Sequence, residues 1–138
     1  MPQRDQLHGV VRAVLERDGW RITHDPLFLQ GGSHNLYVDL GAERLLAAER
    51  GEQKIAVEIK GFTGRSEITE LERALGQYVL YETLLRKSHP GRALVLAVPI
   101  AVHESLLSSE LGRTLQEGFP LRLLVFDPVA EEVRRWIW

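Results

Sequence analysis

The spacing of hydrophobic and polar positions along the chain predicts three helices. Apolar residues recur every three or four positions over residues 5–15, and Asp18-Gly19 ends that helix. The same spacing over residues 66–88, behind an acidic first turn, predicts the strongest helix of the chain. Residues 102–117 predict a third helix. The apolar stripe expected on the second helix comprises Ile68, Leu71, Leu75, Tyr78 and Leu85.

Extended segments fill the region between the first two helices. Residues 36–40 are short and apolar, and residues 54–60 alternate and are rich in Ile and Val, which predicts two strands. Residues 43–50 are ambiguous between a helical turn and a strand, and the Arg-Gly-Glu run at 50–52 predicts a hairpin turn. We expect a meander of three extended segments.

Further strands complete the expected sheet. Residues 20–29 predict a strand broken by a bend at Asp25-Pro26. Residues 93–98 and 121–126 predict buried strands, and residues 133–138 predict an edge strand. This order favours an α/β fold, a three-layer α/β/α sandwich with a central mixed sheet. With 138 residues and 44% apolar content, the chain fits a single domain.

The charge balance excludes a broadly basic protein. Lys and Arg number 17 against 19 Asp and Glu, which gives a net charge of −2. Any contact with DNA must therefore come from a local basic patch. The alternative, solvated faces balanced by neighbouring glutamates, fits most of the basic residues. The candidates for a patch are Arg12, Arg17, Arg21, Arg65, Arg73, Arg86 and Lys87.

The remaining composition narrows the kind of site. The chain has no cysteine, and its five histidines show no pair at metal-binding spacing, so neither a thiolate site nor a zinc site has support. The longest apolar run, residues 93–98, is too short to span a bilayer. We expect a soluble, cytoplasmic protein with no membrane partner.

The alternating strand at residues 55–60 carries the first candidate chemistry. Side chains two positions apart on a strand point to the same face, so Glu58 and Lys60 lie side by side, while Ile55, Val57 and Ile59 anchor the other face. An adjacent acid and ammonium group can also be an ordinary surface ion pair, which contributes about 0–1 kcal/mol. The surrounding pattern favours the catalytic interpretation.

An upstream acid supplies that pattern. Asp39 is a lone carboxylate in the apolar segment 36–40 and converges on Glu58 if the two strands are neighbours. Two carboxylates, the backbone carbonyl of Ile59 and water would form an oxygen-rich site suited to Mg²⁺ or Mn²⁺. Such a site suits phosphodiester hydrolysis, in which Lys60 either orients or deprotonates the water, or stabilises the added negative charge.

Two further polar side chains lie on the long helix. Gln77 and Tyr81 are four residues apart and share one helix face, which could direct both at the same site. In the alternative, Tyr81 is a half-buried core residue and Gln77 is solvated.

Several blocks of sequence closely resemble the XisH family, the fdxN element excision controlling factors. The resemblance extends over nearly the whole chain. Its most distinctive blocks are residues 37–43, 55–60 and 74–78, and it continues through residues 4–8, 18–20, 23–26 and 125–128.

The resemblance implies a restriction-endonuclease-like fold of the PD-(D/E)XK superfamily and a role in DNA rearrangement beside a site-specific recombinase and a XisI-like partner. Asp39, Glu58 and Lys60 fall on the two metal-ligand positions and the catalytic-lysine position of that superfamily. Gln77 and Tyr81 resemble the Q-x-x-x-Y element of RecB-like nucleases. Val38 replaces the proline of the motif. His8, in the opening block, joins the candidate catalytic residues.

Two functions follow from these observations, and in a third possibility the protein acts only inside a complex with the XisI-like partner. The first is a Mg²⁺-dependent DNA endonuclease, which could act as a homodimer. The second is a non-cleaving regulator that binds nucleic acid or a partner and keeps the nuclease fold. The terminal Trp136-Ile137-Trp138 run is compatible with an interface and equally with core packing.

Overall fold

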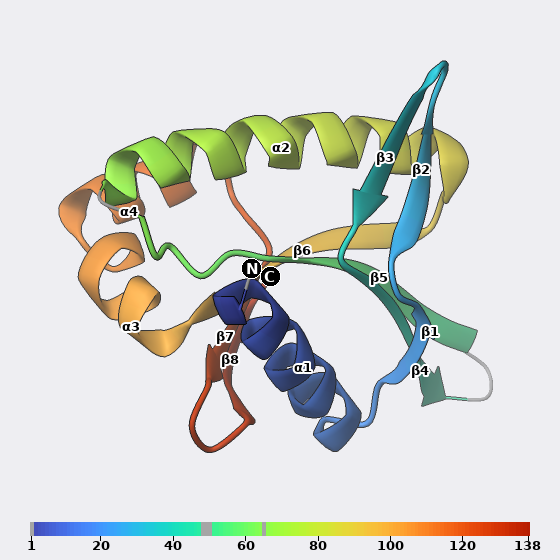
Figure 1. Ribbon diagram of the computed structural model, residues 1–138, viewed down its shortest axis with the longest axis horizontal. Coiled ribbons are helices and arrows are strands. Elements are labelled where there is room, and N and C mark those ends of the chain that lie inside the picture. Colours follow the sequence, from blue (N-terminus) through green and yellow to red (C-terminus); the bar gives the residue numbers. More distant parts are fainter. Residues whose placement is uncertain (1, 48–50, 65) are drawn as a thin grey trace.

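A computed structural model describes residues 2–47, 51–64 and 66–138 (Figure 1). Its helical elements are α1 (Pro2–Arg17), α2 (Glu67–Ser88), α3 (Ile100–Val102), the π-helix η1 (His103–Leu107) and α4 (Glu110–Gly118). Its strands are β1 (Arg21–His24), β2 (Leu27–Gly31), β3 (His34–Val38), β4 (Leu40–Ala47), β5 (Gly51–Ile59), β6 (Arg92–Pro99), β7 (Leu123–Asp127) and β8 (Glu132–Ile137).

Six strands form one mixed sheet, as the sequence predicts. Their order is β1-β4-β5-β6-β7-β8, with β5, β6 and β7 parallel and the outer pairs antiparallel. Each parallel pair is connected by a helical crossover, through α2 between β5 and β6 and through α3, η1 and α4 between β6 and β7. The predicted edge strand is confirmed as β8.

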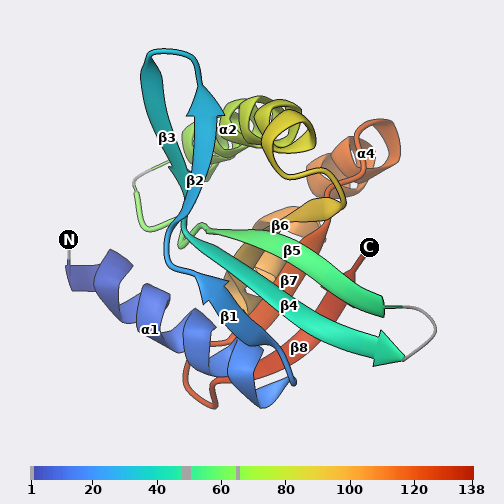
Figure 2. The same ribbon diagram turned by 90° about the vertical axis from the view of Figure 1, so that its right-hand side faces the viewer.

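Helices cover both faces of this sheet (Figures 1 and 2). α1 buries Val11, Val14 and Leu15 against one face, and α2 buries Leu71, Ala74, Tyr78 and Leu85 against the other. In β5, Ile55 and Val57 belong to the α1 side and Ala56 to the α2 side. The alternation of β5 therefore separates two apolar cores rather than a core from solvent.

The long helix begins and ends where the sequence predicts. The Ser66 side chain accepts a hydrogen bond from the N–H of Thr69 and caps the first turn. Ile68 is an error in the predicted stripe, because 47% of it is exposed. The buried positions centre on Ala74 and Tyr78, and at 100° per residue Ile68 lies roughly 90° away around the helix.

The predicted helix at residues 102–117 is wrong as a continuous element. The segment contains α3, η1 and α4, and the side chain of Ser109 accepts from the N–H of Gly112 to start α4 afresh. A Cβ at Gly112 would lie 2.3 Å from the carbonyl oxygen of Leu107, so the break requires glycine there. Apolar residues keep helical spacing on both sides of Ser108 and Ser109. The sequence pattern therefore gives no sign of the break.

The predicted meander of three strands is also wrong. β3 ends at Val38, Asp39 lies in a bend, and β4 begins at Leu40. β3 pairs with β2 in a separate two-stranded hairpin that projects from the body of the molecule (Figures 1 and 2). The ambiguous segment is a strand as far as Ala47, and Arg50 of the predicted turn lies outside the described residues.

The predicted broken strand at residues 20–29 is found as two strands, β1 and β2, separated at Asp25-Pro26. They belong to different sheets. None of the helices in the described part of the chain is long and apolar enough to cross a membrane.

Candidate functional site

The structure brings Asp39, Glu58 and Lys60 together from two separate parts of the chain. Asp39 occupies the bend between β3 and β4, Glu58 lies near the carboxyl end of β5, and Lys60 follows that strand directly. Because β4 and β5 are antiparallel neighbours with Leu40 opposite Val57, the bend at Asp39 lies beside Glu58. The sequence had placed Asp39 within a strand. That prediction is wrong, because Asp39 lies in a bend.

Two backbone hydrogen bonds hold the acidic residues in place. The backbone N–H of Asp39 donates to Oε1 of Glu58 at 3.3 Å, and the backbone N–H of Ile59 donates to Oδ2 of Asp39 at 2.8 Å. Asp39 is 8% exposed and Glu58 6% exposed. Both acidic residues are therefore buried. Burial of two neighbouring carboxylates is costly, which makes Asp39 and Glu58 candidates for a ligand site.

Lys60 supplies the compensating charge. Its Nζ lies 3.5 Å from Oε2 of Glu58, and its side chain is 25% exposed, so the ammonium group reaches the surface above a buried carboxylate. The prediction that Glu58 and Lys60 share a face is confirmed. The surface ion-pair alternative does not describe this contact, because Glu58 is buried.

The electrostatics of Glu58 reflect its surroundings. Burial is the main cause that raises the pKa of Glu58, to about 7, and the nearby Asp39 raises it further. The ammonium of Lys60 and the hydrogen bond from the Asp39 backbone oppose this change. A bound cation next to both carboxylates would relieve the cost of ionising Glu58.

A cavity of about 530 Å³ opens beside these residues. Its wall comprises Leu7, Tyr37, Glu58, Ile59, Lys60, Gly61, Phe62, Thr63, Glu70, Arg73, Gln77 and Tyr81. The structure thus places the predicted Gln77 and Tyr81 at the same site as Glu58 and Lys60. The side-chain oxygen Oε1 of Gln77 is buried and has no hydrogen-bond partner among the described residues. Because buried polar atoms normally have a partner, this oxygen is available to accept a hydrogen bond from a ligand.

Sequence reasoning missed Glu70 and Phe62 in this wall, and it named Arg73 only as a candidate for a basic patch. Glu70 and Arg73 lie on the face of α2 that carries Gln77 and Tyr81, and their i, i+3, i+7 and i+11 spacing was the available signal. Phe62 has a φ of 53°, a strained conformation for a residue with a side chain, and it too lines the cavity. The local sequence does not predict this backbone conformation of Phe62.

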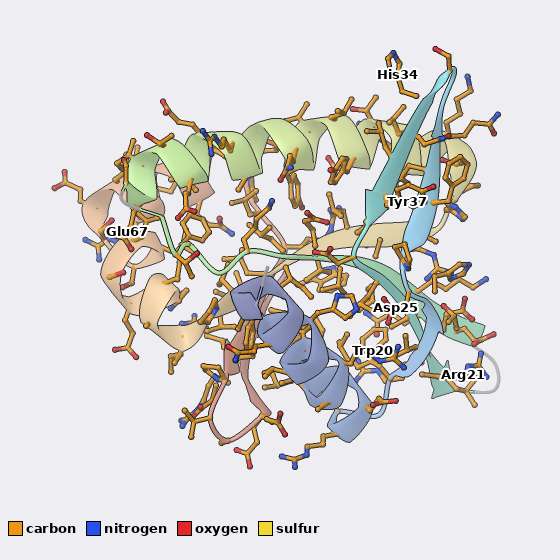
Figure 3. The ribbon with its side chains drawn as sticks, viewed as in Figure 1. Trp20, Arg21, Asp25, His34, Tyr37 and Glu67 are labelled. Atoms are coloured by element: carbon orange, nitrogen blue, oxygen red, sulfur yellow. The ribbon has the colours of Figure 1, made fainter. Side chains whose placement is uncertain are left out.

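His8 is the predicted site residue that the structure places elsewhere. It lies on α1 outside the cavity wall, with its Nε2 2.7 Å from Oδ1 of Asp25. The same carboxylate forms an ion pair with Arg12, and Figure 3 shows Asp25 beside α1. His8 and Arg12 thus hold the bend after β1 against α1.

Some of the candidate basic residues contact other parts of the protein, and one lies at the cavity. Besides Arg12, Arg21 pairs with Glu43 and Glu52, which neutralises it, and Arg17 donates to the carbonyl of Ala130. Arg65 lies outside the described residues. Arg73 lines the cavity and forms no ion pair with any described residue, so it and Lys60 provide the positive charge at the site.

The terminal aromatic run contributes mainly to core packing. Trp136 packs on Trp20 at 5.7 Å between ring centroids, and the indole N–H groups of both donate to Oδ2 of Asp18. Ile137 packs against the core on the α2 side. Trp138 is 59% exposed and is the member of the run left at the surface.

Comparison with known proteins gives a consistent family. A family model described as XisH protein matches residues 1–134. The crystal structure of an XisH family protein from Nostoc punctiforme is similar, with 36% identity, a TM-score of 0.86, and coverage of 96% of this chain and 99% of that chain. An fdxN element excision controlling factor protein from Anabaena variabilis is similar at 38% identity and a TM-score of 0.86, with coverage of 97% and 99%. No curated protein matches the sequence.

Proposed function

The chain belongs to the XisH family, and from that premise we propose that it is a Mg²⁺-dependent DNA endonuclease of the PD-(D/E)XK superfamily with a restriction-endonuclease-like fold. We further propose that it acts in DNA rearrangement, as the name of the Anabaena variabilis relative suggests for that protein. One observation carries the proposal: backbone hydrogen bonds fix the buried carboxylates of Asp39 and Glu58 side by side, and Glu58 lies 3.5 Å from the ammonium of Lys60 in the wall of a cavity.

The donor set fits a hard divalent cation. Asp39 and Glu58 are oxygen donors held together by backbone hydrogen bonds, and Ile59, whose carbonyl would be the third donor, lies beside Glu58 in the cavity wall. No group of three or more His, Cys, Asp or Glu suited to a metal occurs among the described residues. We propose instead a cation held by two carboxylates, a carbonyl and water, an arrangement that Mg²⁺ accepts. The raised pKa of Glu58 adds support, since a cation would favour its ionised form.

The residues divide the chemistry between them. When bound, Mg²⁺ or Mn²⁺ would supply a Lewis acid that makes water nucleophilic and neutralises charge on the phosphate. Asp39 and Glu58 would hold it. Lys60 reaches the surface of the cavity and serves one of two roles: orienting or deprotonating the water, or stabilising the added negative charge. The amide of Gln77 and the ring of Tyr81 line the cavity wall on α2 and position the substrate there.

The experiment that tests this proposal pairs metal binding with cleavage. Isothermal titration of Mg²⁺ and Mn²⁺ into the wild type and Asp39→Ala is combined with a nicking assay on supercoiled, linear and branched DNA. We expect Asp39→Ala to lose both metal binding and cleavage. Asp127→Ala is the matched control, because Asp127 also accepts backbone hydrogen bonds, but its partners are Val129, Ala130 and Arg134 and not the residues around Glu58.

A second candidate function is a regulator that binds DNA or a partner without cutting. The name of the Anabaena variabilis relative, a controlling factor of excision, favours it. The net charge of −2 also favours partner-assisted over unassisted DNA binding. A folded wild type that neither binds metal nor cuts any of these DNA forms would support the regulator and contradict the nuclease.

Partners remain proposals that rest on the family. We propose DNA as the ligand, and a XisI-like protein and a site-specific recombinase as protein partners. A homodimer would supply two sites for cutting two strands. Co-purification with a XisI-like protein and light scattering of the chain alone test the two assemblies separately.

A further inference from the structure

The β2–β3 hairpin carries an aromatic pair on its outer face. Phe28 and Tyr37 lie directly opposite each other across the two strands, with ring centroids 5.5 Å apart and planes tilted by 59°. They are 43% and 49% exposed. Their neighbours Leu27, Leu29 and Val38 point the other way and are fully buried. The hairpin thus has an inner face that belongs to the core and an outer face that presents two rings to solvent.

The outer face also lacks charge. Residues 26–38 contain no Asp, Glu, Lys or Arg, although 26% of the chain is charged. The exposed side chains beside the two rings are Gln30, Ser33, His34 and Asn35, which offer hydrogen-bond donors and acceptors. Figure 3 shows His34 at the tip of the hairpin and Tyr37 nearer the body. The hairpin itself therefore presents no carboxylate to an approaching polyanion.

Tyr37 connects the hairpin to the candidate active site. Its side chain forms part of the wall of the cavity that contains Glu58, Lys60 and Arg73. The aromatic pair therefore adjoins the cavity through Tyr37. Tyr37 lies near the end of β3, and the first residue of that strand, His34, lies at the hairpin tip.

We propose that the outer face of the hairpin binds unpaired bases of a DNA strand by stacking on Phe28 and Tyr37, and that the substrate is therefore single-stranded or branched DNA. The choice of DNA rests on the proposed function. Stacking needs a free base face, which a duplex does not offer, whereas single-strand binding proteins use aromatic side chains in this way. Stacking also suits a protein whose net charge of −2 gives little general attraction to phosphate.

The test measures binding in EDTA, so that it does not depend on cleavage. Fluorescence anisotropy follows a labelled oligothymidylate of about 20 nucleotides and a duplex of the same length, titrated with the full chain. Phe28→Thr and Tyr37→Thr remove one ring each and keep a residue that suits a strand. Tyr37→Phe keeps the ring. Trp138→Thr removes an aromatic residue that is 59% exposed and lies outside the hairpin, as a matched control.

We expect the wild type to bind the oligothymidylate more tightly than the duplex. Each threonine variant of the hairpin should weaken single-strand binding by about 5- to 100-fold, from the usual contribution of one stacked base. Tyr37→Phe and Trp138→Thr should bind like the wild type. Threonine variants that keep their melting temperature and still bind the oligothymidylate normally would overturn the inference, and so would a wild type that prefers duplex.

The two proposals fail in different ways. Metal-dependent cleavage together with unchanged binding by the hairpin variants would leave the nuclease and remove the stacking surface. Hairpin-dependent binding of single strands by a chain that never cuts would do the opposite. If the threonine variants alter only self-association in light scattering, the aromatic pair is a contact between copies of the chain and the inference is wrong.

Discussion

The backbone N–H of Ile59 donates a hydrogen bond of 2.8 Å to the carboxylate of Asp39, a residue 20 positions earlier in the chain. This contact fixes the bend after β3 against the end of β5. It holds the Asp39 carboxylate beside Glu58, whose own Oε1 accepts from the N–H of Asp39. The two acids are thus positioned by main chain, which moves less than side chains do, and a preorganised site follows.

The raised pKa of Glu58 makes the stability of the metal-free protein depend on pH. The folded chain keeps a proton on Glu58 up to a pH of about 7, whereas the unfolded chain releases it near the ordinary glutamate pKa of 4.5. The folded state is therefore favoured at low pH, and this contribution is lost as the pH rises from 4.5 to 7. At pH 8, Glu58→Gln should be more stable than the wild type by on the order of 2–3 kcal/mol.

Urea unfolding at pH 5 and pH 8 checks this expectation. The gain should shrink below about 1 kcal/mol at pH 5, where the folded wild type already carries the proton. Glu72→Gln, at an exposed position of α2, should change stability little at either pH. An equal gain from Glu58→Gln at both pH values would show that the ionisation of Glu58 is not the cause.

Lys60→Met should separate metal binding from catalysis. The ammonium of Lys60 contacts Glu58 at 3.5 Å but is not a metal ligand, so the affinity for Mn²⁺ should stay within about tenfold of the wild type. Cleavage should fall by about 100-fold or more, in line with the loss of one charge that stabilises the transition state. Single-turnover rates and titration calorimetry give the two quantities. Lys87→Met, at an exposed position in the last turn of α2, is the control. Normal cleavage by Lys60→Met would remove Lys60 from the mechanism.

Tyr78→Phe should destabilise the fold without touching the site. The Tyr78 hydroxyl accepts hydrogen bonds from the backbone N–H and the guanidinium of Arg122, each at 3.2 Å. Its loss leaves a partly buried N–H without this partner, at a cost of about 1–3 kcal/mol. Thermal unfolding should show this loss, while Tyr37→Phe, at an exposed ring, should change stability by less than about 0.5 kcal/mol. Equal stability of both variants would contradict the role of the Tyr78 hydroxyl.

Two glycines of the helices should respond in opposite directions to alanine. A Cβ at Gly112 would lie 2.3 Å from the carbonyl oxygen of Leu107, so Gly112→Ala should cost several kcal/mol, about 3 or more. A Cβ at Gly76, in the middle of α2, meets nothing within 4 Å, so Gly76→Ala should stabilise by about 0.5–1 kcal/mol. Urea unfolding of both variants measures the difference. A stable Gly112→Ala protein would mean that α4 can shift away from η1.

The sequence by itself determined the elements that depend on local spacing. The bounds of α2, the strands β6, β7 and β8, and the shared face of Glu58 and Lys60 all follow from periods of 3.6 and 2 residues and from caps. The broken helix at residues 102–117 was missed, because Gly112 is required by a contact with Leu107 that spacing does not encode.

Only the tertiary structure decided which segments meet. β3 pairs with β2 and not with the main sheet, because the chain bends at Asp39 between β3 and β4. Both of these segments have an extended sequence pattern. The same bend places Asp39 beside Glu58. Arg73 and Gln77 on α2 line the cavity. His8 instead contacts Asp25. Side-chain types and periods are local properties, but the pairing of distant strands and the packing of helices depend on the whole core, so the site was complete only in three dimensions.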